Sequence, residues 1–180
     1  MTPFIDDVRI AAEQHRIPLP VLCSLIKIES NWNPWAFNPE PPYRYLWDLR
    51  RDRPFRTVTV TERASEYPPT DFSDVFRRYG QGADHEWWGQ QMSWGLMQVM
   101  GAVARERGFR EPYLAKLSDP ATNLDFGCRH LRWLLDWSDG NIEQALAAYN
   151  GGMAGNYSTP YRNAMYVERV MAWHDTYLSA

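Results

Sequence analysis

Apolar residues recur at helical spacing along most of the chain outside residues 38–93. Residues 3–15 carry one apolar stripe, which predicts a first helix that begins at its proline. Pro18 and Pro20 interrupt this pattern, and the apolar run at residues 21–30 predicts a second helix that is buried nearly all round. The start of the chain is therefore predicted to form two consecutive helices.

Helical spacing returns after residue 93 and continues towards the C-terminus. Glycines that end helices and prolines that begin them divide this part of the chain into segments. We expect helices over residues 96–107, 119–140 and 142–150, and a last helix that begins at Thr159 and Pro160. Together with the first two helices, these segments predict a mainly α fold.

Residues 38–93 have a different pattern, rich in proline, arginine and aromatic residues and with little helical period. The alternation of valine and threonine over residues 57–61 predicts one arm of a short β-hairpin, and residues 70–79 are expected to form a short helix. Because 180 residues suffice for one domain, we predict a single domain over residues 1–180 with an irregular inserted lobe at 38–93.

The net charge of −3 provides no basic field, which argues against nucleic acid as a partner. No apolar run approaches the roughly 20 residues that span a bilayer, so stable membrane insertion is not expected. The first residues lack the charged start, apolar run and cleavage site of a signal peptide. Aromatic residues make up 14% of the chain, more than a core of this size needs, and their rings suit sugars or interfaces.

The two cysteines, Cys23 and Cys128, lie in apolar helical segments without a CxxC pair or a histidine cluster nearby. We therefore predict buried free thiols and neither a disulfide framework nor a zinc site. His85 has no second ligand at metal spacing. No metal and no cofactor are expected.

Glu29 is the first candidate for chemistry. It ends the run VLCSLIKIES, whose apolar neighbours predict either a buried carboxyl group with a raised pKa or a solvated helix end. A carboxylic acid that stays protonated near neutral pH can protonate a glycosidic oxygen. Helix position alone leaves both interpretations open.

Two further clusters carry polar groups beside glycines. In SWGLMQVM, residues 93–100, Gln98 can bind a sugar amide or hydroxyl group and the methionines offer adaptable apolar surface. In AYNGG, residues 148–152, Tyr149 and Asn150 come at a helix end before a sharp turn. Each cluster taken alone fits a purely structural role better than a functional one.

Together these clusters resemble the catalytic domain of soluble lytic transglycosylases, which are relatives of goose-type lysozyme. The resemblance rests on several motifs in the right order, and it covers residues 3–37 and 93–173. The motifs are ESNWNPWA (29–36), SWGLMQVM (93–100), DPATNLDFGCRHLRWLL (119–135), AYNGG (148–152) and the closing Tyr166 and Val167 with Val170. It implies a lysozyme-like helical fold and leaves the inserted lobe unexplained.

The resemblance also implies roles for individual residues. Glu29 would be the single catalytic acid and base that cleaves the MurNAc–GlcNAc bond and leaves a 1,6-anhydro ring. The implied substrate-binding residues are Met97, Gln98, Met100, Tyr149, Asn150 and Tyr166. Within this set Asn150 is also expected to brace the fold, as is Ser30, and Trp32 is expected to be a core aromatic.

Two other functions stay open. In many members of the family the acid and the Gly-Leu-Met-Gln block lie closer in sequence, so the insert leaves room for a remodelled groove. A goose-type muramidase would hydrolyse the same bond with a second carboxylate, for which Asp84 and Glu86 are the candidates beside Trp87 and Trp88. A wall-binding or virion structural module would keep the fold without activity.

The expected partner is the glycan strand of peptidoglycan, bound by a monomer. Without a signal peptide, such a protein would be made in the cytoplasm and reach the wall as a phage endolysin released through a membrane lesion, or on a virion. We therefore predict a phage-delivered enzyme that acts on the bacterial cell wall.

Overall fold

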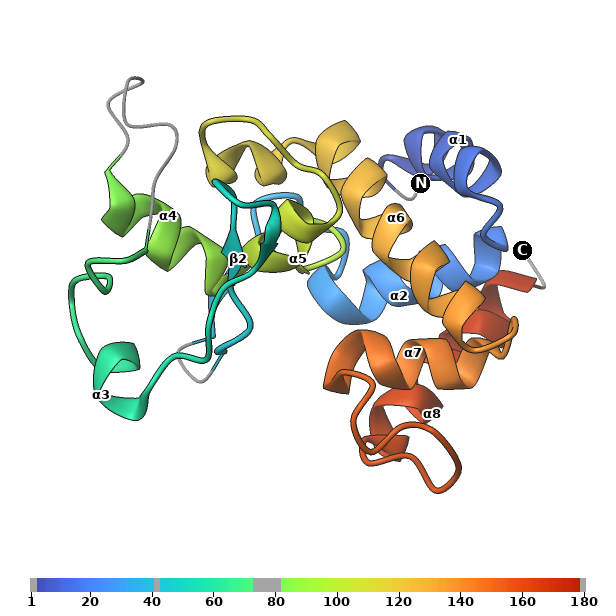
Figure 1. Ribbon diagram of the computed structural model, residues 1–180. Coiled ribbons are helices and arrows are strands. Elements are labelled where there is room, and N and C mark those ends of the chain that lie inside the picture. The colour runs from blue at the N-terminus through green and yellow to red at the C-terminus, as the bar shows by residue number, and fades with distance from the viewer. Residues whose placement is uncertain (1–2, 41–42, 73–81, 179–180) are drawn as a thin grey trace. The chain divides into compact units, whose positions relative to one another are not determined.

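The computed structural model describes residues 3–40, 43–72 and 82–178, and it is mainly α-helical (Figure 1). The chain divides into two compact units, which we call unit 1 and unit 2. Unit 1 combines Met1–Asn33 with Gly127–Ala180, and unit 2 is the segment between them, Pro34–Phe126. Over the described residues, no helix has the length and apolar character needed to cross a membrane.

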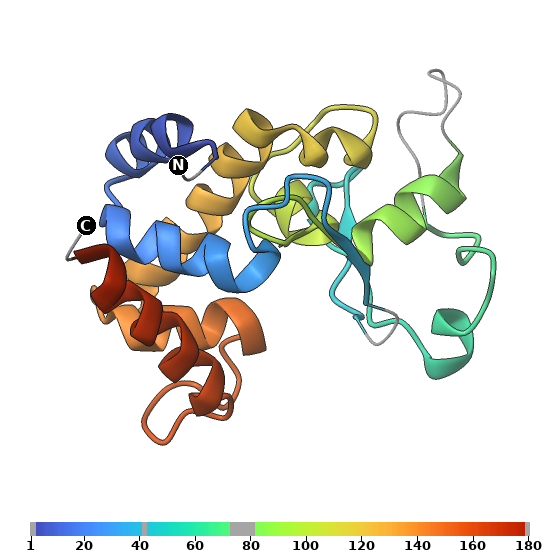
Figure 2. The same cartoon turned by 180° about the vertical axis from the view of Figure 1, so that it is seen from behind.

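Unit 1 is built from helices. They are α1 (Ile5–His15), α2 (Leu19–Ser30), the C-terminal part of α6 (Pro120–Trp137), α7 (Ile142–Gly151) and α8 (Ala164–Leu178). Helix α8 packs along α2, as Figure 2 shows with α8 in red and α2 in blue, and it also packs against α7.

Helix α1 begins two residues later than predicted, because Phe4 has a left-handed backbone conformation with φ 60° and occupies the N-cap position. Helix α2 confirms the predicted second helix. Pro18 occupies its N-cap position and Pro20 its first turn, where a missing N–H costs nothing. Its residues Val21–Ile26 are all buried, and the left-handed Asn31 ends it directly after Ser30.

The remaining helices of unit 1 follow the predicted pattern with one exception. Asn141 caps α7, its side-chain oxygen accepting a hydrogen bond from the Gln144 backbone N–H at 3.0 Å. The last helix begins at Ala164 and not at the predicted Thr159 and Pro160. The residues before it include Asn156 and Asn163, whose side chains are hydrogen-bonded to the backbone of α7. Cys23 on α2 and Cys128 on α6 are both buried, as predicted, and neither forms a disulfide in the structure.

Unit 2 contains the strands. Their bounds are β1 (Phe37–Pro39), β2 (Trp47–Asp48), β3 (Arg53–Pro54), β4 (Met92–Trp94) and β5 (Val99–Met100). Strands β1, β4 and β5 form one antiparallel sheet in that order, in which Phe37 pairs with Trp94 and Ser93 with Met100. Strands β2 and β3 form a short hairpin.

Residues 38–93 therefore contain a short hairpin, but at residues 47–54 and not at the predicted 57–61. Thr59 instead caps the short helix α3 (Val60–Arg63) in a capping box with Glu62, whose side chain accepts from the Thr59 backbone N–H at 2.9 Å. Of the helix predicted over residues 70–79, residues 73–79 lie outside the described part of the chain.

The predicted helix over residues 96–107 is shorter than expected. Residues 96–98 form the turn between β4 and β5, and α5 (Gly101–Glu106) begins only after β5. Gly101 is required there, because a Cβ atom at this position would lie 2.1 Å from the backbone oxygen of Gly89, at the end of α4 (Ala83–Gln90). Helices α4 and α5 thereby pack closely.

The core of unit 2 combines a hydrophobic cluster with a buried ion pair, in which Nη2 of Arg105 donates to Oε2 of Glu86 at 2.8 Å. Leu46, Val58, Phe72, Trp87 and Ala102 form the cluster, in which the rings of Phe72 and Trp87 meet edge to face at 5.2 Å.

The short 3₁₀ helix Leu114–Ser118 leads into α6. Asp119 caps α6, its carboxylate accepting from the Thr122 backbone N–H at 3.1 Å.

Candidate active site

Glu29 lies in the last turn of α2, next to its fully buried face. Leu25 and Ile26 on the preceding turn have no exposed surface, whereas Glu29 is half-buried. The hydroxyl group of Tyr166, on α8, donates a hydrogen bond to Oε1 of Glu29. The helix pairing of α2 and α8 therefore brings together two residues that are far apart in the sequence.

Tyr149, near the end of α7, faces the same carboxylate. Burial, and after it the negative charge of Glu29, raises the pKa of both Tyr149 and Tyr166 well above the ordinary value of 10. Both phenols therefore keep their protons at neutral pH. Two neutral phenols therefore lie near the carboxyl group of Glu29, and one of them donates a hydrogen bond to it.

A set of asparagines joins α7 to the start of α8. The Asn163 side-chain amide donates to the Ala147 backbone oxygen at 3.1 Å and to Oδ1 of Asn150 at 3.0 Å. Asn156, which is fully buried, donates to the same Ala147 oxygen at 3.2 Å and to the Gly152 oxygen at 2.8 Å. We call Asn150, Asn156 and Asn163 the asparagine joint.

The asparagine joint fixes the first turn of α8. The backbone oxygen of Asn163 accepts from the Tyr166 backbone N–H at 2.9 Å, and Oδ1 of Asn156 accepts from the Arg162 N–H at 3.0 Å. Tyr166 follows Asn163 by less than one helical turn, so these bonds fix the backbone from which its side chain extends. Asn150 contributes to the joint by accepting the hydrogen bond from the Asn163 side chain.

Two residues on α6 extend the site and were not predicted. The imidazole ring of His130 lies against the ring of Tyr149, with centroids 5.4 Å apart and planes tilted by 44°. The indole ring of Trp133 stacks on the imidazole ring of His130, with centroids 6.1 Å apart and planes tilted by 13°. Their spacing of three residues on a helix was the available signal, because it places both rings on one face.

The other predicted site residues belong to unit 2. Gln98 has a left-handed backbone conformation with φ 47°, which costs free energy for a residue other than glycine. Its side-chain amide donates to the backbone oxygens of Ala36 at 3.0 Å and Gly95 at 2.9 Å, and its oxygen accepts from the Ser93 hydroxyl at 2.9 Å. These bonds hold the turn between β4 and β5 in one conformation.

The two methionines of this motif differ in exposure. Met97 is fully buried, and its backbone N–H donates to Oδ1 of Asn123 at 2.8 Å. Met100 is half-buried and occupies the N-cap position of α5. Of the two, only Met100 presents surface to a ligand.

The two candidates for a second carboxylate lie on α4. Glu86 has no exposed surface, and its Oε1 and Oε2 accept from Nε and Nη2 of Arg105 at 2.9 and 2.8 Å. Gln90 donates to Oε1 as well, at 2.8 Å. This burial contradicts a water-activating role for Glu86, because solvent does not reach it. Asp84 is exposed and lies 3.6 Å from Nδ1 of His85.

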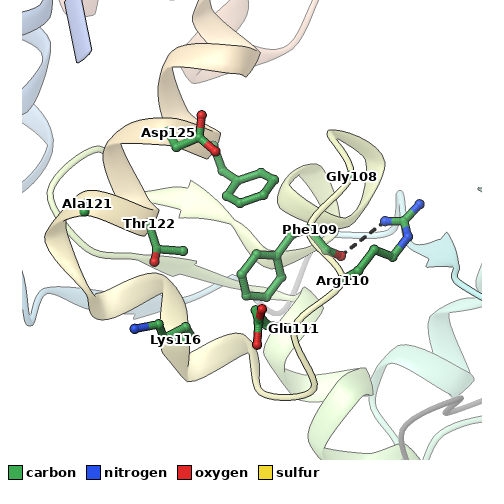
Figure 3. A pocket seen from close by; sticks show the side chains of 9 residues that line it. Gly108, Phe109, Arg110, Glu111, Lys116, Ala121, Thr122 and Asp125 are labelled. Carbon is green, nitrogen blue, oxygen red and sulfur yellow. Dashed lines mark hydrogen bonds between the residues drawn. The ribbon is translucent and has the colours of Figure 1, made fainter. Parts of the chain in front are cut away.

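Unit 2 also contains an open pocket of about 540 Å³ beside the first turns of α6 (Figure 3). Phe109, Phe126 and several charged side chains line it, among them Lys116 and Asp125. None of the predicted site residues lines this pocket. Among the residues that the structure describes, no three His, Cys, Asp or Glu side chains form a group that could hold a metal ion.

The family model described as Transglycosylase SLT domain matches residues 7–165. The match covers more than half of the chain and includes Glu29, Gln98 and Tyr149, and it ends one residue before Tyr166.

Proposed function

The chain belongs to the family of Transglycosylase SLT domains, which act on peptidoglycan, and from this premise we propose a specific reaction. The protein cleaves the β-1,4 bond between MurNAc and GlcNAc as a lytic transglycosylase and leaves a 1,6-anhydro-MurNAc end. The observation that carries this proposal is the half-buried carboxyl group of Glu29 with the Tyr166 hydroxyl bonded to it.

In the first step Glu29 donates its proton to the oxygen of the glycosidic bond, and the bond from that oxygen to C1 of MurNAc breaks. The acetamido oxygen of the same sugar stabilises the positive charge that develops at C1. In the second step the 6-hydroxyl oxygen bonds to C1 and its proton returns to Glu29. Water is not consumed, and the carboxyl group is regenerated.

The two tyrosines support this cycle through their protonation state. Because the raised pKa values keep Tyr149 and Tyr166 neutral, neither phenol adds a negative charge beside Glu29 at neutral pH. The bond from Tyr166 orients Oε1 of Glu29. We assign both tyrosines to orienting the acid and contacting the substrate.

In unit 2 we assign sugar contact to Gln98 and Met100, and packing to the buried Met97. The single catalytic domain over residues 1–180, with residues 38–93 as an insertion, belongs to the same proposal. So do delivery to the wall by a phage lysis system and action as a monomer.

The test is mass spectrometry of the muropeptides released from purified peptidoglycan, with Glu29→Gln as the control. We expect products one water lighter than reducing sugars, and we expect the substitution to reduce cleavage about 10³-fold with little change in thermal stability. Reducing ends would indicate hydrolysis, with Asp84 as the carboxylate to examine next. Cleavage that survives in Glu29→Gln would remove the assignment of Glu29.

A further inference from the structure

We propose that Trp133 and His130 form a subsite that binds a pyranose ring of the glycan strand beside the catalytic carboxyl group. This inference rests on the proposed function, because it names a second contact for the same substrate. The family match covers both residues and assigns a role to neither.

The subsite is a continuous series of rings. It begins at Trp133, whose side chain is 38% exposed, and continues through the stacked imidazole of His130 to Tyr149. Tyr149 lies close enough to Glu29 for the charge of the carboxylate to raise the pKa of its phenol. An exposed indole is thus connected through ring contacts to the reacting end of the site.

The chemistry of these rings suits a sugar. A pyranose presents C–H groups on its flat face and hydroxyl groups around its rim, and an indole offers a matching flat apolar face with a polar N–H. The imidazole behind the indole holds it at an interplanar angle of 13°, which limits the rotation of Trp133 and lowers the entropic cost of binding.

The alternative is that Trp133 and His130 only support Tyr149. In that case removing the indole would disturb Tyr149 and reduce the rate of the chemical step. A sugar-binding subsite makes a different prediction, because a contact that is equal in the ground state and the transition state changes KM and leaves kcat nearly unchanged.

The matched control is Trp173, on α8. It has the same residue type and nearly the same exposure, 36%, and it belongs to the same unit. Its indole lies against the Lys27 ammonium group at 4.8 Å and the Tyr177 ring at 6.1 Å. If losing an exposed tryptophan were the only cause of weaker binding, substitutions of Trp133 and Trp173 would weaken it equally.

The first measurement is binding of a purified GlcNAc–MurNAc octasaccharide to the full chain that carries Glu29→Gln, by calorimetry. Adding Trp133→Ala is expected to weaken binding about tenfold, as for the loss of one aromatic stacking contact. Adding Trp173→Ala is expected to leave the dissociation constant within about twofold, the level of a surface change without contact. Equal effects of the two substitutions would overturn the subsite.

The second measurement is kinetic and uses Glu29 intact. With Trp133→Ala we expect KM for glycan strands to rise about tenfold and kcat to stay within about twofold, and Trp133→Phe to recover part of the loss. A fall in kcat at unchanged KM would assign the rings to supporting Tyr149 and overturn the proposal. Absence of cleavage by the unmodified chain would contradict the proposed function, while the binding measurement would still decide the subsite.

Discussion

Glu29 in unit 1 and Glu86 in unit 2 are the same residue type in two opposite settings. Glu29 is half-buried and accepts a hydrogen bond from a neutral phenol. Glu86 is fully buried and its two oxygens accept from the guanidinium group of Arg105. The partner of the first carboxyl group is thus a neutral hydroxyl, whereas both oxygens of the second are bonded to a cation.

The two settings also differ in what the bonded partners connect. Arg105 donates further bonds to the backbone oxygens of Phe109 at 3.0 Å and Glu111 at 2.7 Å. Gln90, which donates to Glu86, also bonds the backbone of Trp47 through both of its polar side-chain atoms. The pair in unit 2 therefore connects α4, α5 and the hairpin, and it serves the fold.

The sharpest test of this contrast is Arg105→Met. The substitution leaves Glu86 buried without its cation, so we expect the free energy of unfolding to fall by about 3–5 kcal/mol. Urea unfolding measures the change. Adding Glu86→Leu should recover part of it, because the buried charge is then removed, and a loss below about 1 kcal/mol in Arg105→Met would contradict the structural role of the pair.

In unit 1 the corresponding change is Tyr166→Phe, which removes one hydroxyl group and little volume. We expect kcat on peptidoglycan strands to fall on the order of tenfold, because Glu29 loses the hydrogen bond that orients it. The melting temperature should change by no more than a few degrees. Unchanged kcat would mean that the bond is structural, as it is for Glu86.

A smaller effect is expected from Asn163→Ala, which removes the two hydrogen bonds that this residue, directly before α8, donates within the asparagine joint. We expect about 1 kcal/mol less stability and a fall of about threefold in kcat, since Tyr166 is less well fixed. Thr176→Ala, at the other end of α8, is the control for helix stability. Equal kcat in the two variants would contradict the coupling between the joint and Tyr166.

The smallest effect concerns a third glutamate, Glu62 at the surface of unit 2. Hydrogen bonds from Arg56 and the Thr59 N–H lower its pKa from the ordinary value of 4.5 to about 2. Because the pKa is lower in the folded state, this contribution to stability is fully present above pH 4.5 and is lost as the pH falls towards 2. Glu62→Gln should therefore flatten the pH dependence of stability in that window, measured by urea unfolding. If Glu62→Gln left the pH dependence of stability unchanged, this would contradict the lowered pKa of Glu62.

Much of unit 1 could be predicted from the sequence because its helices are set by local patterns. The apolar run after Pro20 predicts α2, and the glycine after the last apolar turn predicts the end of α7. The start of α8 could not be predicted in this way. It depends on Asn156 and Asn163, whose partners lie on α7, so that tertiary contacts and not local preference decide where the helix begins.

Unit 2 was harder to predict because its signals are short. Alternating valine and threonine at 57–61 satisfy a strand pattern, yet Thr59 followed by Glu62 is also a capping-box sequence, and the capping box forms. The burial of Glu86 had no local signal, because its cation, Arg105, lies on another helix. For the candidate site, the motifs singled out Glu29, Tyr149 and Tyr166, which the structure brings together, whereas the ring contacts of His130 and Trp133 were not predicted.

The buried thiols of Cys23 and Cys128 have a practical consequence. Burial raises the pKa of Cys23 to about 11, so this group remains a thiol at neutral pH and reacts with alkylating reagents only when it is exposed. The chain has two cysteines and both belong to unit 1. The rate of alkylation therefore measures how often unit 1 opens, and it does not report on the opening of unit 2.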